Sequence, residues 1–350
     1  MTILVTGGAG FIGSNFILDW FAHAREPVLN VDKLTYAGNL QNLDSVAARK
    51  DYFFFRIGIE ETSKIRRLLS AHSVRAIINF AAESHVDRSI SGPEAFFQTN
   101  VIGTQRLLEA ARDYWQSGDA PADFRFLQVS TDEVFGSLSP ADPPFTEDSP
   151  YRPNSPYAAS KAGADHVARA YWQTYGLPVM VTNCSNNYGP YQFPEKLVPL
   201  VIHNALSGKD LPVYGDGQQV RDWLYVSDHC AALRRVLEAG RPGESYAIGG
   251  NAEMTNLAVI RSICASLDHL RPLPGERPHA DQIAFVRDRP GHDRRYAIDA
   301  SKLERELGWK PQTGFEEGLR RTVEWYLANS SWVESVTSGQ YRDWIARQYA

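Results

Sequence analysis

Short apolar runs alternate with amphipathic stretches through the first half of the chain. The runs are rich in Val, Ile and Phe and lack polar alternation, which is the pattern of parallel strands buried on both faces. This alternation predicts an α/β fold, a Rossmann-like doubly wound parallel sheet with helices on both faces and ligands at the carboxyl ends of the strands. We expect strands at residues 3–6, 28–31, 52–55, 76–80, 124–129 and 179–184, and helices at 14–24, 63–71, 96–115 and 157–175.

The alternation is lost after about residue 190. Proline and glycine become frequent, as in Gly215-Asp216-Gly217, and the apolar runs are shorter. Residues 220–226 predict one further short strand, and residues 315–328 predict a helix. We therefore expect a Rossmann domain over residues 1–187 and a smaller C-terminal α+β domain over 188–350, with a segment near 219–239 returning to the first domain.

Composition narrows the class of protein. The 350 residues carry 36 Lys and Arg against 41 Asp and Glu, and the net charge of −5 argues against a nucleic-acid or anionic-membrane partner. No apolar stretch reaches the roughly 20 residues of a membrane-spanning helix, and the first residues lack the basic region of a signal peptide. Cys184, Cys230 and Cys264 are widely spaced, which predicts neither a disulfide framework nor a metal site. We expect a cytoplasmic protein.

A glycine-rich turn follows the first predicted strand and precedes the first predicted helix. Gly8, Gly10 and Gly13 fit the dinucleotide fingerprint, and Gly7, Gly10 and Gly13 fit its GxxGxxG variant. Such a turn brings the backbone close to a pyrophosphate at the N-terminus of the helix. Asp32 ends the second strand 19 residues after Gly13, where a carboxylate bonds the adenosine ribose and repels a 2′-phosphate. The sequence therefore predicts NAD rather than NADP.

Tyr157 and Lys161 are four residues apart on a predicted helix and would share one face. A phenol with a pKa of about 10 is a poor base at neutral pH. A nearby ammonium favours the phenolate and lowers that pKa, so the pair predicts a base that removes a proton from a hydroxyl. The spacing by itself also fits two exposed residues that share a face by chance.

Polar clusters follow three of the predicted strands. They are residues 81–85, 130–133 and 186–190. Because the carboxyl ends of parallel strands meet at one edge of a sheet, we expect the three clusters to lie together.

Taken together, these features resemble the extended short-chain dehydrogenases/reductases, and within them the dTDP-glucose 4,6-dehydratase family, over essentially the whole length. The glycine turn and the Tyr157–Lys161 pair are common to many unlike enzymes of the superfamily. The discriminating piece is Thr131-Asp132-Glu133, since the related epimerases typically lack adjacent carboxylates there. The resemblance also rests on residues 36–40, 81–90, 99–101, 185–190, 194–200, 212–217, 220–226 and 289–293.

The resemblance implies roles for five catalytic residues in converting dTDP-glucose to its 4-keto-6-deoxy product. Tyr157, helped by Lys161, would take the proton of the C4 hydroxyl as C4 is oxidised, and Thr131 would hydrogen-bond the C4 oxygen. Glu133 would then take the C5 proton, and Asp132 would protonate the departing C6 hydroxyl. Two adjacent carboxyls in opposite protonation states need environments that separate their pKa values. The alternative is a solvated helix start, where carboxylates are favoured.

The resemblance also implies two sets of binding residues. For NAD they are Gly7, Gly10, Phe11, Ile12, Gly13, Asp32, Lys33, Thr35, Ile59, Ala81, Ala82, Ser84, Thr99, Tyr157, Lys161 and Asn187. For the nucleotide-sugar they are Ser84, Thr131, Asn186, Lys196, Leu197, Pro212, Tyr214, Arg221, Asn256, Arg289 and His292.

Three positions depart from the family's pattern. Gly58-Ile59 stands where the family usually has Asp-Ile, so the adenine would lose a carboxylate contact that Glu60, Glu61 or water would have to replace. Phe135 replaces the usual Tyr after the acidic pair, and Gln219 replaces a common Asn.

Two other kinds of function stay open. One is a different nucleotide-sugar 4,6-dehydratase or a 4-epimerase, and Asp132-Glu133 argues against the epimerase. The other is a non-catalytic NAD(P)-binding regulator, against which the intact Tyr157 and Lys161 argue. The helices at residues 96–115 and 157–175 form a dimeric four-helix bundle in relatives, so we expect a homodimer.

Overall fold

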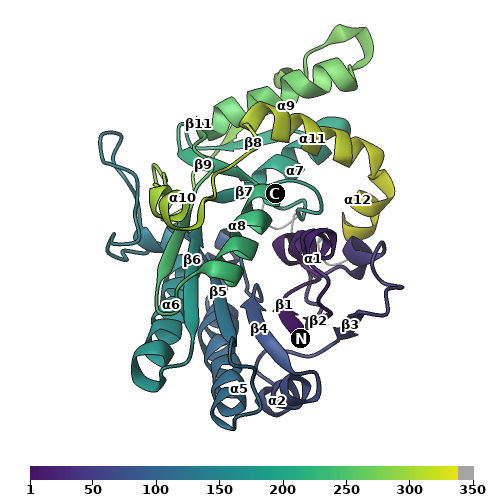
Figure 1. Ribbon diagram of the computed structural model, residues 1–350. Coiled ribbons are helices and arrows are strands. Elements are labelled where there is room, and N and C mark those ends of the chain that lie inside the picture. The colour runs from purple at the N-terminus through teal and green to yellow at the C-terminus, as the bar shows by residue number, and fades with distance from the viewer. Residues whose placement is uncertain (338–350) are drawn as a thin grey trace.

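A parallel seven-stranded sheet runs through the centre of the computed structural model, which describes residues 1–337 (Figure 1). Its strands are β1 (Thr2–Thr6), β2 (Val28–Val31), β3 (Tyr52–Phe55), β4 (Val74–Asn79), β5 (Arg125–Thr131), β6 (Val179–Cys184) and β10 (Ser245–Ile248). The strand order is β10-β6-β5-β4-β1-β2-β3, and every pairing is parallel. The order reverses between β1 and β4, which creates a ligand crevice at their carboxyl ends. The predicted doubly wound α/β class is confirmed.

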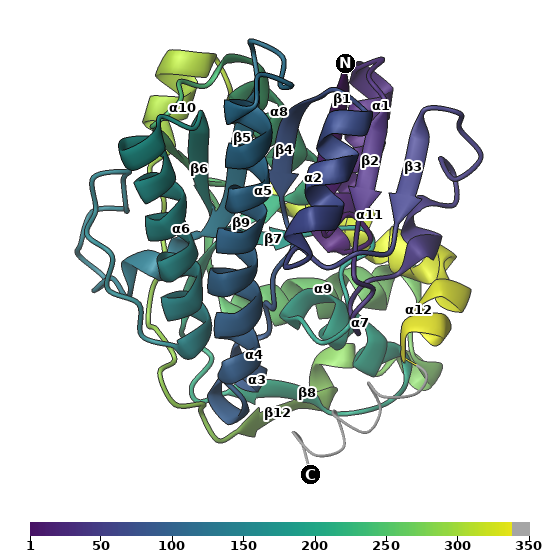
Figure 2. The ribbon, with the colours of Figure 1, turned by 90° about the horizontal axis from the view of Figure 1, so that it is seen from below.

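Helices cover both faces of this sheet. On one face lie α1 (Phe11–His23) and α8 (Val226–Ala239), and on the other lie α2 (Thr62–Ala71), α5 (Thr104–Gln116) and α6 (Pro156–Tyr175) side by side (Figure 2). Successive side chains of a strand point to opposite faces, so Ile3 and Val5 join the core under α1 and α8 while Leu4 joins the core under α5. Burial on both faces explains the unbroken apolar runs in the sequence.

Local signals fix the start and the end of α6. The Ser155 hydroxyl caps the helix by accepting a hydrogen bond from the Ala158 backbone N–H at 3.1 Å, and Pro156 takes the first helical position. Gly176 ends the helix in the left-handed conformation with φ +73°. The first turn therefore begins at the residue before Tyr157, which sets the direction of the Tyr157 and Lys161 side chains.

The helix predicted at residues 96–115 is broken into three segments. These are α4 (Glu94–Phe96), the π-helical turn η2 (Phe97–Gly103) and α5. Asn100 lies in the π-helical turn, and its amide donates to the Glu83 carbonyl at 3.0 Å and the Ser160 hydroxyl at 2.8 Å while accepting from the Glu83 N–H at 2.9 Å. The wider turn joins the loop after β4 to α6, a long-range role that hydrophobic periodicity does not reveal.

The later part of the chain builds two small sheets with helices around them. The predicted strand at residues 220–226 is β9, but it pairs with β7 and β11 instead of the large sheet. The segments that return to the large sheet are α8, which packs against α1, and β10, which pairs with β6. The two-domain boundaries stay a prediction. The remaining helices and strands of the whole described chain are α3 (Val86–Ser91), β7 (Asn186–Tyr188), α7 (Leu197–Leu206), β8 (Leu211–Tyr214), β9 (Val220–Tyr225), β11 (Glu253–Thr255), α9 (Asn256–Leu270), β12 (Ile283–Val286), α10 (Ser301–Leu307), α11 (Phe315–Ala328) and α12 (Ser330–Thr337). The 3₁₀ turns are η1 (Leu40–Leu43), η3 (Asp132–Phe135), η4 (Pro274–Glu276) and η5 (His279–Gln282).

Two features of residues 1–337 bear on membrane and metal partners. None of the helices in that range combines the length and the apolar character that crossing a membrane requires. No group of His, Cys, Asp and Glu side chains in the same range has the geometry to hold a metal ion. Cys184, Cys230 and Cys264 are free thiols and are buried.

Candidate active site

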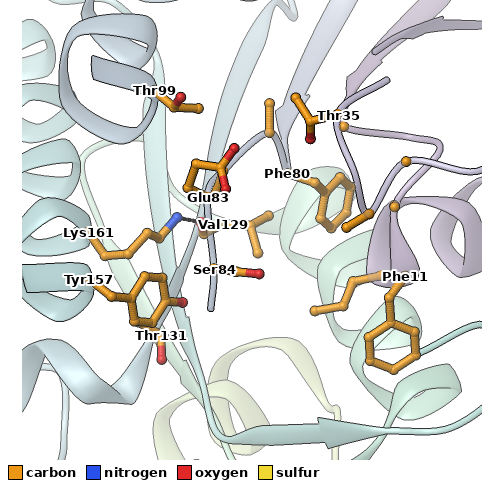
Figure 3. Close-up of a pocket in the computed structure, with 18 of the residues that line it drawn as sticks. Phe11, Thr35, Phe80, Glu83, Ser84, Thr99, Val129, Thr131, Tyr157 and Lys161 are labelled. Atoms are coloured by element: carbon orange, nitrogen blue, oxygen red, sulfur yellow. Dashed lines mark hydrogen bonds between the residues drawn. The ribbon is translucent and has the colours of Figure 1, made fainter. Parts of the chain in front are cut away.

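A cavity of about 590 Å³ opens at the carboxyl ends of β1, β4, β5 and β6. The three polar clusters that follow the predicted strands all contribute to its wall, as the topology led us to expect. Every residue predicted to bind NAD, and every predicted catalytic residue, lines this one cavity. Figure 3 shows Phe11 projecting from one side and Tyr157 and Lys161 from the other.

The glycine turn between β1 and α1 is built for close backbone approach. Gly7 has φ +65°, and a Cβ there would lie 2.7 Å from the Ala81 nitrogen. A Cβ on Gly13 would lie 2.3 Å from the Gly7 carbonyl oxygen. Gly10 precedes α1 without a side-chain cap, and the first turn carries no acidic residue. The first backbone N–H groups and the positive end of the helix dipole can thus bind a pyrophosphate.

Asp32 closes the cavity at the end of β2. Its carboxylate accepts hydrogen bonds from the Ala9 N–H at 2.9 Å and the Leu34 N–H at 2.7 Å, so it ties the glycine turn to β2. Burial raises its pKa, and the two backbone hydrogen bonds oppose that shift. Each oxygen keeps a second lone pair, which fits a ribose hydroxyl. The residues of this wall therefore fit a dinucleotide with an unphosphorylated ribose.

The loop with the unusual Gly58 places a different carboxylate at the cavity. Glu60 lines the cavity and accepts a hydrogen bond from the Lys33 ammonium at 2.6 Å, and its carboxylate lies where a Cβ on Gly58 would point. Glu61 lies outside the cavity wall and accepts a hydrogen bond from the Gly58 N–H at 3.0 Å. Of the two carboxylates suggested by the sequence, Glu60 is the one at the cavity.

Tyr157 and Lys161 extend from the same face of α6 into the cavity, with Thr131 beside the phenol (Figure 3). The Lys161 ammonium donates to the Val129 carbonyl at 2.7 Å. Burial raises the pKa of Tyr157 well above its ordinary value, and the charge of Glu133 raises it further. In the protein chain alone, desolvation of the phenolate therefore outweighs the lowering that we expected from Lys161.

Asp132 and Glu133 have different surroundings although they are adjacent. Burial raises the pKa of Asp132 well above its ordinary value, and the charges of Glu133 and Asp222 add to the effect. Burial also raises the pKa of Glu133, but the cations Arg289, Lys196 and Arg221 oppose it. Burial and like charges therefore favour the protonated form of Asp132, whereas the neighbouring cations favour the ionised form of Glu133. Such a separation allows one carboxyl to act as an acid and its neighbour as a base.

Thr131 caps the 3₁₀ turn that carries these two carboxyls. Its hydroxyl accepts a hydrogen bond from the Glu133 N–H at 3.3 Å and donates to Asp132 at 3.3 Å. The carboxyls therefore stand at a capped turn at the end of β5. Because Asp132 is only 1 % exposed, the solvated helix start considered from the sequence does not describe it.

The predicted nucleotide-sugar residues divide into two groups. Ser84, Thr131, Asn186 and Lys196 line the cavity. The others lie outside its wall, namely Leu197, Pro212, Tyr214, Arg221, Asn256, Arg289 and His292.

Two of the outlying residues are held by one buried carboxylate of α3. Asp87 accepts hydrogen bonds from the Tyr214 hydroxyl and from the Arg289 guanidinium, both at 3.0 Å. Arg221 donates to the Asp293 carbonyl at 2.9 Å. Arg289 and Arg221 both act on the charge of Glu133, so positive charge is gathered beside the acid–base pair in a protein whose net charge is negative.

Several cavity residues were missing from the sequence prediction. Glu195 is the clearest of them, because its side chain is only 2 % exposed, accepts a hydrogen bond from the Tyr36 hydroxyl at 2.7 Å and lies 3.7 Å from Arg88. The sequence signal that could have identified Glu195 is its position directly before Lys196, in the motif at residues 194–200. Glu83 and Ser130 lie in the predicted strand-end clusters without having been chosen. The further cavity residues outside the prediction include Phe80, Gln98, Val129, Cys184, Ser185, Gln192 and Phe193.

Comparison with known proteins finds relatives over nearly the whole chain. Residues 4–322 match the model of the GDP-mannose 4,6 dehydratase family. The dTDP-glucose 4,6-dehydratase of Xanthomonas campestris pv. campestris strain B100 is 60% identical over 343 residues, which are 97% of each chain. The dTDP-glucose 4,6-dehydratase 1 of Escherichia coli K12 is 54% identical over 359 residues, covering 100% of this chain and 99% of its own.

Solved structures of related enzymes have the same fold as this chain. The crystal structure of DesIV, a dTDP-glucose 4,6-dehydratase of Streptomyces venezuelae with NAD and TYD bound, superposes with a TM-score of 0.88 at 48% identity, covering 96% of this chain and all of its own. The UDP-glucose 4-epimerase of Thermus thermophilus in complex with NAD superposes with a TM-score of 0.82 at 30% identity, covering 94% and 100% of the two chains. The fold is thus common to dehydratases and epimerases, but by its family match and its high identity over full length the chain belongs to the GDP-mannose 4,6 dehydratase family and, within it, to the dTDP-glucose 4,6-dehydratases.

Proposed function

We propose that the protein is an NAD-dependent dTDP-glucose 4,6-dehydratase, a hydro-lyase that forms dTDP-4-keto-6-deoxyglucose for deoxysugar biosynthesis. The observation that carries the proposal is the Asp132–Glu133 pair, whose members line one cavity with Tyr157 and have separated surroundings. An oxidation and re-reduction at C4, as in an epimerase, needs no such pair. Loss of water from C5 and C6 needs both an acid and a base.

The cofactor would lie between the glycine turn and the Tyr157 side of the cavity. Gly7, Gly10 and Gly13 would admit its pyrophosphate to the N-terminus of α1, and Asp32 would bond the adenosine ribose. NAD, when bound, would supply the hydride acceptor and a cationic ring at the Tyr157 side of the cavity. Asp32 would exclude a 2′-phosphate by charge repulsion and by lack of space at an already hydrogen-bonded carboxylate.

The first chemical task falls to Tyr157. Its phenolate would accept the proton of the C4 hydroxyl while C4 is oxidised, and Thr131 would hold the C4 oxygen by a hydrogen bond. Burial disfavours the phenolate, so positive charge at this position is essential. The Lys161 ammonium, one helical turn away and buried beside the cavity, would supply part of that charge.

The second task is the removal of water. A ketone at C4 acidifies the proton on C5, and Glu133, drawn toward its ionised form by neighbouring cations, would accept that proton. Asp132, kept protonated by burial, would give its proton to the C6 hydroxyl, which leaves as water. The resulting C5–C6 double bond is reduced at C6 with the hydride that C4 released, and Glu133 would return its proton to C5. The net change is the loss of one water molecule without oxidation.

Binding of the diphosphate would use the cations around Glu133. Lys196 lines the cavity, and Arg221 and Arg289 lie behind its wall within electrostatic reach of Glu133. Arginine offers a planar fork and a permanent charge, which suits a diphosphate. The thymine preference rests on the names of the relatives that share more than half of their residues with this chain.

Assembly and location belong to the same proposal. The homodimer is supported by exposed apolar side chains on η2, where Phe97 is 42% and Ile102 is 44% exposed. Ile102→Glu should convert the dimer to a monomer in light scattering. The control Phe285→Glu, which places the same charge at an exposed apolar position on β12, should leave the dimer intact.

The three free, buried thiols support a reducing, cytoplasmic location.

A turnover assay on four nucleotide sugars tests the function. Purified protein is incubated with dTDP-, UDP-, GDP- or CDP-glucose, and the 4-keto product is followed by its absorbance in alkali. We expect turnover with dTDP-glucose and at least about tenfold lower kcat/KM with the others. Formation of the C4 epimer would make the protein an epimerase, and NAD binding without any product would make it a regulator.

A further inference from the structure

A second buried carboxylate lies behind the catalytic pair. Asp165 follows Lys161 by one turn on α6, so both side chains leave the same face of the helix. The residue is 3 % exposed and lies outside the wall of the cavity. The proposed mechanism gives Asp165 no contact with substrate or cofactor.

Three hydrogen bonds from different parts of the chain converge on one oxygen of Asp165. Its Oδ2 accepts from the Ser130 hydroxyl at 2.6 Å, the Tyr151 hydroxyl at 3.1 Å and the Asn183 amide at 3.3 Å. Each partner donates, which is the arrangement that stabilises a carboxylate anion. Ser130 directly precedes Thr131, and the Asn183 amide also donates to the Thr131 carbonyl at 3.2 Å. The carboxylate thus joins α6 to the ends of β5 and β6 just behind the catalytic turn.

The charge of the same carboxylate acts on the buried Lys161 ammonium. Burial lowers the pKa of Lys161, and the two opposing charges that act on it come from Asp165 and Cys184. Burial raises the pKa of the Cys184 thiol to about 12, so the thiol is neutral at physiological pH. The pKa of Asp165 is raised to about 6, so Asp165 is ionised there. Asp165 is accordingly the anion that favours the charged form of Lys161.

Two titratable groups near Asp165, Tyr151 and Arg169, do not supply the negative charge that Asp165 supplies. Burial raises the pKa of Tyr151, whose ring lies 5.1 Å from that of His166, and Arg169 opposes the rise. Tyr151 is therefore neutral and serves as a donor. The lysine can keep its charge in this apolar setting only with a compensating anion nearby.

We propose that Asp165 is a positioning residue of the active site, which holds Ser130 and the catalytic turn of β5 in place and supplies the negative charge that keeps Lys161 protonated. The proposal rests on the proposed function insofar as Lys161 serves Tyr157. Its physical core, the charge coupling between Asp165 and Lys161, is independent of any activity.

Nuclear magnetic resonance of protein labelled with ¹³C at the lysine ε-carbon measures that coupling directly. The Lys161 signal is assigned by its loss in Lys161→Met. In the wild-type protein we expect a small change of this signal with a midpoint near pH 6, where Asp165 titrates. In Asp165→Asn this change should vanish, and the titration midpoint of Lys161 should fall by about one pH unit or more.

A matched buried carboxylate provides the control. Asp228 on α8 does not line the cavity, and it accepts hydrogen bonds from the Gln312 N–H at 3.0 Å and the Thr313 N–H at 2.7 Å. Asp228→Asn should lower the melting temperature and leave the Lys161 titration unchanged. Asp165→Glu, which restores a carboxylate, should return the midpoint toward the wild-type value.

The pH profile of turnover separates the two levels of the proposal. In Asp165→Asn the alkaline limb of kcat should move to lower pH with the Lys161 midpoint. An unchanged Lys161 midpoint in that variant, or no wild-type change near pH 6, would overturn the proposal and leave Asp165 a purely structural residue. If the midpoint moves while kcat keeps its profile, the coupling stands and the role assigned to Lys161 in the proposed function is wrong. The wild-type titration decides the coupling even if the variant does not fold.

Discussion

The two halves of the active-site cavity present different chemistry to a ligand. In the turn half, formed by residues 7–13 with Asp32, the wall is mainly backbone, and glycines are required because a Cβ would collide with a neighbouring peptide. In the acid–base half, formed by residues 131–133 with Tyr157 and Lys161, the wall consists of buried ionisable side chains whose pKa values are displaced by burial.

This difference separates binding from chemistry. Backbone N–H groups at a helix N-terminus bind an anion without any change of protonation, so the turn half should control affinity for the cofactor. Displaced pKa values put protons where a reaction needs them, but they reduce the free energy of unfolding. The acid–base half should therefore control the rate, and substitutions in the two halves should affect different measured quantities.

The largest effect is expected from the acidic pair. Each acid or base typically contributes about 10²–10⁴-fold to a rate, so Asp132→Asn combined with Glu133→Gln should lower kcat by about 10⁴-fold or more. The variant should still oxidise C4, because neither carboxyl is needed for that step. Mixing it with excess dTDP-glucose should therefore build up the absorbance of reduced nicotinamide.

Glu147→Gln combined with Asp148→Asn is the matched control, since this adjacent acidic pair lies outside the cavity wall. It should retain kcat within a few-fold. Near-normal turnover of the Asp132–Glu133 variant would remove the pair from the mechanism. Loss of both turnover and reduced nicotinamide, with the fold intact, would place the pair in substrate binding.

Tyr157→Phe should have the next largest effect and should stop the reaction earlier. Removing the C4 base should lower kcat by about 10²–10⁴-fold, and no reduced nicotinamide should appear. The control is Tyr171→Phe on the same helix, whose hydroxyl bonds Glu109 away from the cavity. Rapid-mixing absorbance checks the result, and reduction of the cofactor at the wild-type rate would show that another group is the base.

The two halves also differ in how well the sequence predicts them. The turn half follows from contiguous residues, because Gly7, Gly10 and Gly13 sit between one strand and one helix. The surroundings of the acid–base half come from contacts that local patterns do not contain, such as that of Arg289 with Asp87, 202 residues apart. Local patterns therefore do not reveal that Arg289, which the resemblance assigns to the nucleotide-sugar, lies behind the cavity wall. Sequence spacing likewise reveals the ammonium near Tyr157 but not the burial that raises its pKa, because burial is a property of the packed structure.

A smaller effect is expected on folding stability at Asp165, which lies behind the acid–base half. The pKa of Asp165 is raised from 3.8 to about 6, so the native state holds this proton to higher pH than the unfolded state. Stability from this group is complete below about pH 4 and is lost as pH rises through about 6. Urea unfolding should show wild type losing about 3 kcal/mol relative to Asp165→Asn between about pH 3 and about pH 7. A pH-independent difference between the two proteins would mean that Asp165 titrates normally.

The smallest effect is expected in the turn half, where Asp32→Ala tests binding without touching the chemistry. Loss of a hydrogen bond to a charged group costs about 1.5–3 kcal/mol, so Kd for NAD should rise by roughly ten- to hundredfold, while kcat at saturating NAD should stay within a few-fold of wild type. NADP should lose less affinity than NAD, because removing the carboxylate also removes its repulsion of the 2′-phosphate. Calorimetric titration with both dinucleotides measures the ratio. Equal weakening of NAD and NADP would show that Asp32 serves only to hold Ala9 and Leu34, and a large fall in kcat would break the separation of the two halves.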